Sequence, residues 1–131
     1  MAQNDRTGKL IISVRTANGS IPVEGANVTV RSFDEGESSV IAVLKTDNSG
    51  NTPLIEIGTP SSDISTSPGN GKGYTSVIIE VDKDGFIPME FIGGAIFPGI
   101  TTVQPVNLMP ESEYNGDYDK IILNESEAAT L

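Results

Sequence analysis

Hydrophobic and polar residues alternate one by one along several short segments of the chain. In each segment the apolar side chains share one face and polar side chains occupy most of the other, as in a strand with one buried face. The segments are Lys9–Arg15, with Leu10, Ile12 and Val14 inward; Ala26–Arg31, with Ala26, Val28 and Val30 inward; and Tyr74–Val81, with Val77, Ile79 and Val81 inward and Ser76 and Glu80 outward. The pattern predicts three half-buried β-strands.

Two more extended segments flank a turn motif in the middle of the chain. Val40–Lys45 is apolar enough to be a strand covered on most sides, and Leu54–Ile57 follows the turn residues Asp47–Gly50. Asp and Asn side chains bond to nearby backbone N–H groups, and glycine tolerates positive φ. We therefore expect these two strands to form a hairpin.

Turn residues also separate predicted strands toward the C-terminus. The turn Asp82–Gly85 precedes a predicted strand at Phe86–Ile92, which the next two glycines end, and Ile100–Met109 is a last extended segment. Proline has no N–H to donate to a ladder, so Pro105 places this last strand at a sheet edge or a bulge.

Seven or eight short strands separated by turn signals predict an all-β fold, a Greek-key β-sandwich. Two segments interrupt the strands without hydrophobic periodicity: the acidic loop Ser32–Ser39 and the Ser-, Pro- and Gly-rich loop Thr59–Gly73. Sandwich loops vary while the strands hold them, so we expect binding at these two loops.

The chain has the length of one ordinary domain, at 131 residues. We expect a flexible N-terminus at residues 1–7, a sandwich at 8–110 and an acidic tail at 111–131. The tail contains one apolar group, Tyr118–Leu123, for which two interpretations stay open. It is either part of a disordered terminus or a segment that docks on this domain, a second copy or a partner, adding a strand at the edge marked by Pro105.

The net charge of −10 opposes contact with nucleic acid and with anionic membranes, because both need a positive surface. We therefore expect neither partner. The N-terminus lacks a signal-peptide pattern and no run approaches a membrane span. This predicts a cytoplasmic or spore-associated protein, unless an export signal was removed.

The chain contains no His and no Cys. This excludes Ser-His-Asp and Cys-His catalysis, histidine-ligated zinc and disulfides. A paired-carboxylate glycosidase is disfavoured because Trp is absent and sugar platforms are normally aromatic. We expect no enzyme activity, no catalytic residue, no metal-binding residue and no cofactor.

Two acidic turns, Thr46–Thr52 and Asp82–Gly85, have the oxygen-rich composition that calcium favours. Both are too short for an EF-hand loop, and a β-turn uses the same residue types. The glycine-flanked Lys72 is not followed by Ser or Thr at a helix start, so it does not form a phosphate-binding loop. We assign these segments to turns and a loop.

Four ordered blocks, "PVEGANVTV", "KTDNSGNTPLIEI", "YTSVIIEVDKDGF" and "IFPGITTVQPVNLMP", resemble carboxypeptidase regulatory-like domains. The resemblance covers Gly8 to Pro110 and is greatest with the module found in clostridial spore cortex-lytic enzymes. It implies a prealbumin (transthyretin)-like sandwich with a non-catalytic accessory role. The implied partners are a protein, a wall-lytic enzyme or peptidoglycan, and a carbohydrate-binding module is the alternative.

A second alternative is a structural domain like those of Gram-positive pilins and adhesins. Some of these link a first-strand Lys to a last-strand Asn by an isopeptide bond beside an acidic residue. Here Glu80 resembles the acid and Asn107 the acceptor, but Arg15 occupies the place of the Lys and Lys9 lies at the exposed start of the strand. A guanidinium does not form this bond.

Overall fold

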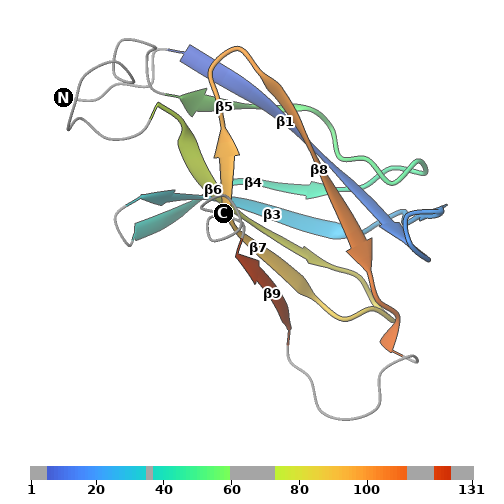
Figure 1. The fold of residues 1–131 in the computed structure, drawn as a ribbon. Coiled ribbons are helices and arrows are strands. Elements are labelled where there is room, and N and C mark those ends of the chain that lie inside the picture. The colour runs from blue at the N-terminus through green and yellow to red at the C-terminus, as the bar shows by residue number, and fades with distance from the viewer. Residues whose placement is uncertain (1–5, 35–36, 60–72, 112–119, 125–131) are drawn as a thin grey trace.

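The structure is a computed structural model that describes residues 6–34, 37–59, 73–111 and 120–124. These residues form nine β-strands (Figure 1). In chain order the strands are β1 (Arg6–Thr16), β2 (Ile21–Pro22), β3 (Asn27–Asp34), β4 (Glu37–Lys45), β5 (Ile55–Thr59), β6 (Thr75–Asp82), β7 (Met89–Ile96), β8 (Thr101–Leu108) and β9 (Ile121–Asn124).

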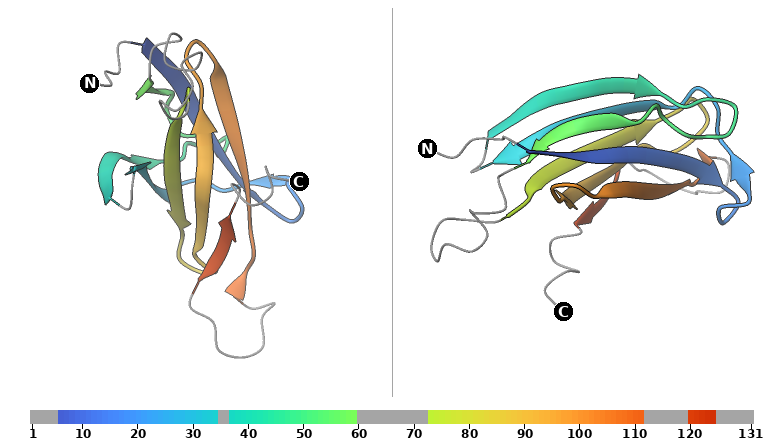
Figure 2. Two further views of the ribbon diagram at one scale, coloured as in Figure 1. Left: turned by 60° about the vertical axis from the view of Figure 1, so that its left-hand side comes forward. Right: turned by 90° about the horizontal axis from the view of Figure 1, so that it is seen from above.

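The strands form two sheets, seen from two further directions in Figure 2. One sheet has the order β4-β3-β6-β7-β9. In the other, β1 lies between β8 on one side and β5 and β2 on the other, the last two pairing with different parts of β1. This confirms the predicted all-β sandwich. The strand count exceeds the prediction because the two-residue β2 and the tail strand β9 also pair.

The predicted alternation supplies the core between the sheets. The inward residues of β1, β3 and β6 are at most 1% exposed, and β7 and β8 add further apolar side chains from each sheet. Ser76, which was expected on the outward face of β6, is also buried but is not part of the core cluster. The core side chains are Leu10, Ile12, Val14, Val23, Ala26, Val28, Val30, Ile57, Val77, Ile79, Val81, Met89, Phe91, Ile96, Val106 and Leu108.

The first and the eighth strands run side by side and parallel. Their register extends from Lys9↔Thr101 to Thr16↔Leu108. The Lys9 N–H donates to the Ile100 carbonyl at 2.9 Å, whereas Ile12 and Val14 donate on the opposite side of β1. Odd-numbered residues of β1 therefore turn their backbone N–H toward β8.

In a parallel ladder, the backbone N–H groups of a strand point alternately toward and away from its neighbour. In β8, the N–H groups of even-numbered residues therefore donate to β1, and those of odd-numbered residues point away from β1. Pro105, which is opposite Ser13, falls in the second group. The missing proline N–H therefore costs no ladder bond. The prediction that Pro105 marks an edge strand is confirmed, because β8 pairs with β1 alone within the described residues.

The predicted hairpin between Val40–Lys45 and Leu54–Ile57 is wrong. The corresponding strands β4 and β5 belong to different sheets, and the segment between them crosses the sandwich. The turn itself forms as predicted, with the Gly50 N–H donating to the Asp47 carbonyl at 2.9 Å. Thr46 and Thr52 mark the two ends of the crossing segment. The buried hydroxyl of each bonds to the backbone of other segments.

The predicted acidic loop at Ser32–Ser39 is also largely wrong, because β3 and β4 continue as a hairpin through it. The register pairs include Ser32↔Ser39 and Asp34↔Glu37. Of the second predicted loop, Thr59–Gly73, residues 60–72 lie outside the described residues. Thr59 itself is the buried last residue of β5.

Glycines 93 and 94 do not end a strand as expected. β7 runs through them to Ile96, and the register with β6 shifts where Gly93, at φ 91°, has no opposite partner. An extra residue in one strand is a β-bulge, and glycine suits its backbone conformation. The strand begins at Met89 and not at Phe86, which forms an isolated bridge with Pro110.

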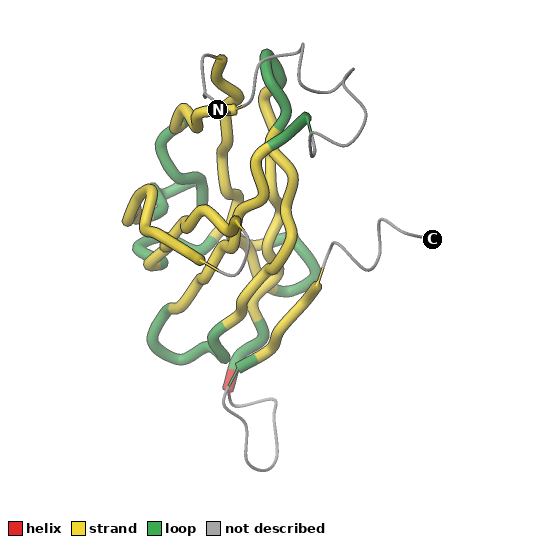
Figure 3. The backbone as a smooth tube through the Cα atoms, turned by 90° about the vertical axis from the view of Figure 1, so that its left-hand side faces the viewer, coloured by secondary structure: helices red, strands yellow, loops and turns green. Residues whose placement is uncertain are grey.

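The ends of the sandwich differ from the predicted boundaries by a few residues. Arg6 and Thr7 already pair with β5, while residues 1–5 lie outside the described residues. At the other end β9 comes from the acidic tail, and Figure 3 shows it along the flank of the sandwich.

Candidate functional site

The residues of the isopeptide alternative do not come together. Arg15 and Asn107 are register partners in the β1–β8 ladder. Glu80 lies on β6 in the other sheet and forms an ion pair with Arg31. Lys9 is exposed, with Glu56 and Thr101 as its register neighbours. Without an acid beside a lysine and an asparagine, this arrangement cannot form the bond.

The tail strand docks on the domain itself. β9 pairs in parallel with β7, from Met89↔Ile121 to Ile92↔Asn124, and the Ile121 N–H donates to the Pro88 carbonyl at 2.9 Å. The docking interpretation is therefore confirmed for residues 121–124. Its predicted position at the Pro105 edge is wrong, because β9 joins the opposite sheet. Tyr118 and Asp119 lie outside the described residues.

An ion-pair network fixes the start of this strand on the outer face of the five-stranded sheet. The Lys120 Nζ lies 2.9 Å from Glu90 Oε1 and 3.5 Å from Glu80 Oε2. Glu80 also pairs with Arg31, so the network links β3, β6, β7 and the residue before β9. The hydrogen bond to Glu90 raises the pKa of Lys120, and the charges of Glu90 and Glu80 add to this effect.

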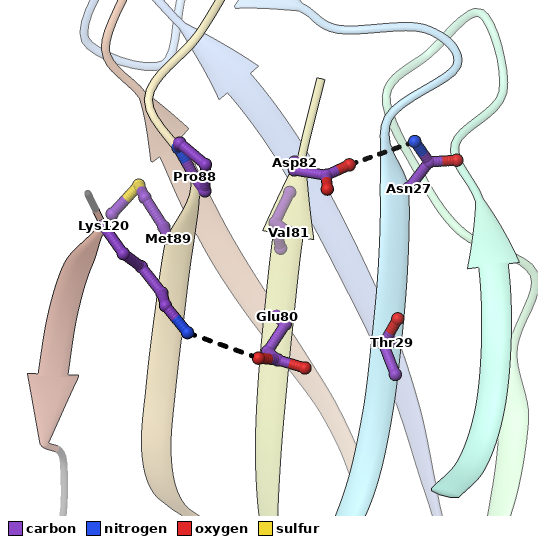
Figure 4. A pocket seen from close by; sticks show the side chains of 8 residues that line it. All are labelled: Asn27, Thr29, Glu80, Val81, Asp82, Pro88, Met89 and Lys120. Carbon is purple, nitrogen blue, oxygen red and sulfur yellow. Dashed lines mark hydrogen bonds and ion pairs between the residues drawn. The ribbon is translucent and has the colours of Figure 1, made fainter. Parts of the chain in front are cut away.

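Beside Lys120 lies an open pocket of about 210 Å³, shown in Figure 4. In the figure the Lys120 amine points along the sheet toward Glu80, and Asp82 meets Asn27 across the top of β6 and β3. The second contact is a hydrogen bond of 3.0 Å from Asn27 Nδ2 to Asp82 Oδ1. The pocket is lined by Asn27, Thr29, Glu80, Val81, Asp82, Pro88, Met89 and Lys120.

A neighbouring pocket of about 490 Å³ shares Asn27, Asp82 and Pro88 with the first. Its further lining includes the Lys83–Phe86 turn and Glu111. The lining of the two pockets contains carboxylates, an amide and the amines of Lys83 and Lys120, and Phe86 is its one aromatic side chain. One aromatic side chain offers little of the flat ring surface on which sugars stack.

In the first acidic turn the carboxylate of Asp47 bonds to the backbone, whereas Asp82 of the second turn bonds to the Asn27 side chain. Asp47 Oδ1 accepts hydrogen bonds from the N–H groups of Ser49 at 2.9 Å and Asn51 at 3.0 Å. Within the described ranges, no group of three or more His, Cys, Asp or Glu side chains could hold a metal ion. No helix in the described part of the chain is long and apolar enough to cross a membrane.

The sequence did not identify Lys120, Glu90 or Arg31 as a unit. The partners of Lys120 are 30 and 40 residues away along the chain, so only the docked position of β9 brings them together. One signal was available: Lys120 is the single basic residue in the acidic tail and directly precedes Ile121 within its apolar group.

No family model and no curated protein matches this chain. Among solved structures it is similar to a minor pilin of Streptococcus agalactiae, with TM-score 0.52 and 14% identity, over 86% of this chain and 48% of the pilin. Catechol 1,2-dioxygenase from an Acinetobacter species gives TM-score 0.52 and 13% identity, over 92% of this chain and 59% of the enzyme. The Bacillus anthracis TIE protein gives TM-score 0.50 and 13% identity, over 80% of this chain and 17% of the TIE protein.

This chain therefore spans less than two thirds of each of these proteins. At such identities the similarity establishes the fold and nothing about activity. Together with the two sheets, it identifies a β-sandwich of the immunoglobulin- or transthyretin-like kind.

Proposed function

We propose that this chain is a non-catalytic β-sandwich module, related to carboxypeptidase regulatory-like domains, that transmits tension within a cell-envelope protein assembly. The role is structural and pilin- or adhesin-like, and the assembly partners are envelope proteins or peptidoglycan. The parallel pairing of β1 with β8 is the observation that carries this proposal.

The parallel pairing matters because of how it loads the hydrogen bonds. The start of β1 and the end of β8 lie at opposite ends of a ladder of eight residue pairs. A pull between these two points slides one strand along the other, so the bonds of the ladder are stressed together. When strands are pulled apart from one end, by contrast, the bonds break one after another. Each bond contributes only about 1 kcal/mol, so joint loading is what gives mechanical strength.

The non-catalytic part of the proposal is supported by composition. Neither His nor Cys occurs in the sequence, which removes the usual proton shuttles and nucleophile–base pairs. The chemistry of the two pockets, with ion-paired carboxylates, fits contact with a protein segment.

The envelope setting is supported by the fold it shares with a minor pilin and by the resemblance of four sequence blocks to accessory modules of cell-wall enzymes.

The proposal is tested by stretching the folded protein between anchors at Arg6 and Met109, which load the β1–β8 ladder, with a single-molecule force instrument. Gln104→Pro removes an N–H that the ladder alternation directs at β1, whereas Val103→Pro removes one directed away from β1. We expect Gln104→Pro to lower the main rupture force strongly and Val103→Pro to lower it little. Equal rupture forces for the two variants, or a low force for the unmodified chain, would overturn the proposal.

A further inference from the structure

The strand β9 closes one edge of the sandwich while contributing little to its core. Of its side chains, Ile121 packs against the core, whereas Ile122 and Leu123 are 56% and 42% exposed. Four ladder pairs and the Lys120 ion pairs complete its attachment. The core itself is built from the earlier strands, so detaching β9 leaves most of the buried apolar surface in place.

The surface under β9 needs an occupant for two physical reasons. Without β9, the backbone of Met89–Ile92 would present unpaired N–H and C=O groups along a sheet edge, which readily accepts another strand. Glu80 and Glu90 would also lose Lys120, and in the described part of the chain Glu90 has no other ion-pair partner. On a protein of net charge −10, an unpaired Glu90 beside Glu80 favours the return of a cation.

The tail of another copy satisfies these needs as well as the chain's own tail. It would bring the same Lys120 to the same carboxylates and the same Ile121 to the same core contact. Exchange of an identical segment changes no contact type, so its cost is mainly the entropy of association. Only the connection between Glu111 and Lys120 has to differ between the two arrangements.

We infer that the β7 edge, with Glu80 and Glu90 beside it, is a strand-acceptor site that also binds residues 120–124 of a second copy of this chain. This inference goes beyond the tension-bearing role, because it concerns how copies join and does not depend on the β1–β8 ladder. The acceptor and donor surfaces are different, so the contact can close into a swapped dimer or continue as an open chain.

Cysteine trapping tests the inference on a clean background, because the chain has no Cys of its own. Ile92 and Asn124 are register partners across β7 and β9, and neither belongs to the ion-pair network. One full-length variant carries Ile92→Cys and the other Asn124→Cys. The two are mixed, equilibrated over a range of concentrations and oxidised, and the linked peptides are identified by mass spectrometry.

The matched control mixes Ile92→Cys with Val43→Cys, which is 70% exposed on the opposite edge strand β4. We expect the 92–124 link between copies to exceed the 92–43 link several-fold and to rise with protein concentration. A 92–124 yield no greater than the control would overturn the inference. A double variant with both cysteines in one chain must also form the link within that chain, and its failure would overturn the β7–β9 pairing.

A charge exchange gives a second readout without cysteines. Lys120→Glu and Glu90→Lys each place like charges together when the tail docks on its own chain. In a mixture, the tail of the Lys120→Glu variant finds a matching cation on the Glu90→Lys variant. We expect a heterodimer by light scattering in the mixture and less in either variant alone. Monomers throughout would contradict exchange, whatever rupture force the ladder shows.

Discussion

Two threonine hydroxyls hold the segment that crosses from one sheet to the other. Thr46 Oγ1 donates to the Val23 carbonyl at 2.6 Å and accepts from the Ala26 N–H at 2.9 Å. The N–H of Ile12 donates to Thr52 Oγ1 at 3.0 Å. Buried backbone groups need such partners because water cannot reach them. These two residues therefore replace ladder bonds where the chain leaves its sheet.

Replacing Thr46 by Val keeps the shape and removes the hydroxyl. The Val23 carbonyl and the Ala26 N–H then lose their partner inside the protein, which costs about 1–3 kcal/mol of unfolding free energy. Denaturant titration measures this change. Thr101→Val, at an exposed position of β8, is the control and should change stability little. Equal effects of the two substitutions would contradict the role assigned to the Thr46 hydroxyl.

Gly50 and Gly19 illustrate two physical reasons why a position favours glycine. Both have positive φ, at 83° and 84°. A Cβ on Gly50 would overlap the Val14 carbonyl oxygen and approach Pro22, whereas a Cβ on Gly19 meets nothing within 4 Å. Gly19→Ala should therefore cost about 1 kcal/mol from the backbone conformation alone. Gly50→Ala should lower the free energy of unfolding clearly more. Thermal melts measure both variants, and equal melting temperatures would contradict an overlap at Gly50 that the structure cannot relieve.

At the scale of single elements, the docking of β9 depends on the charge of Lys120. The raised pKa of Lys120 means that the folded state stabilises its charged form. This stabilisation is fully present below the ordinary pKa of 10.5 and is lost as pH rises through the higher folded-state pKa.

The pH dependence is measured as the difference in melting temperature between the unmodified chain and Lys120→Met. We expect a constant difference near neutral pH that shrinks above about pH 10.5. Lys45→Met removes a lysine with no ion pair among the described residues and serves as the comparison. A difference that persists unchanged at high pH would mean that Lys120 acts through packing.

The apolar contact of β9 is tested by a pair of adjacent substitutions. Ile121→Asp places a charge against the core, while Ile122→Asp places one at a position 56% exposed. Burying an unpaired carboxylate is unfavourable, so Ile121→Asp should release β9 and Ile122→Asp should not. Hydrogen exchange of the residue 121–124 amides reports the release. Retained protection in Ile121→Asp would place the main attachment elsewhere.

The strands were easier to predict than their connections. Alternation of apolar and polar residues identifies the buried face of β1, β3 and β6, because every second side chain of a strand points toward the core. The Asp47–Gly50 turn was also predictable, but its local chemistry is the same in a hairpin and in a crossing between sheets. The bulge at Gly93 was missed for a similar reason: glycine permits both a strand end and an extra residue within a strand.

At the scale of the whole molecule, the sequence predicted a sandwich and an edge position for Pro105. It did not place the tail, since β9 carries too few residues for a periodic signal and its ionic partners lie on distant strands. It also did not reveal that the first and last strands of the predicted sandwich are neighbours. That neighbour relation depends on how all strands pack, and it is the feature on which the proposed function depends.

The most direct test compares two directions of pull on the same folded domain. With cysteine anchors introduced at Arg6 and Met109, force shears the β1–β8 ladder; with anchors at Arg6 and Thr101, it opens the ladder from one end. The account predicts a rupture force several-fold higher in the first geometry. Equal forces in the two geometries would show that the β1–β8 ladder is not what resists tension, and the proposed structural role would then lack its physical basis.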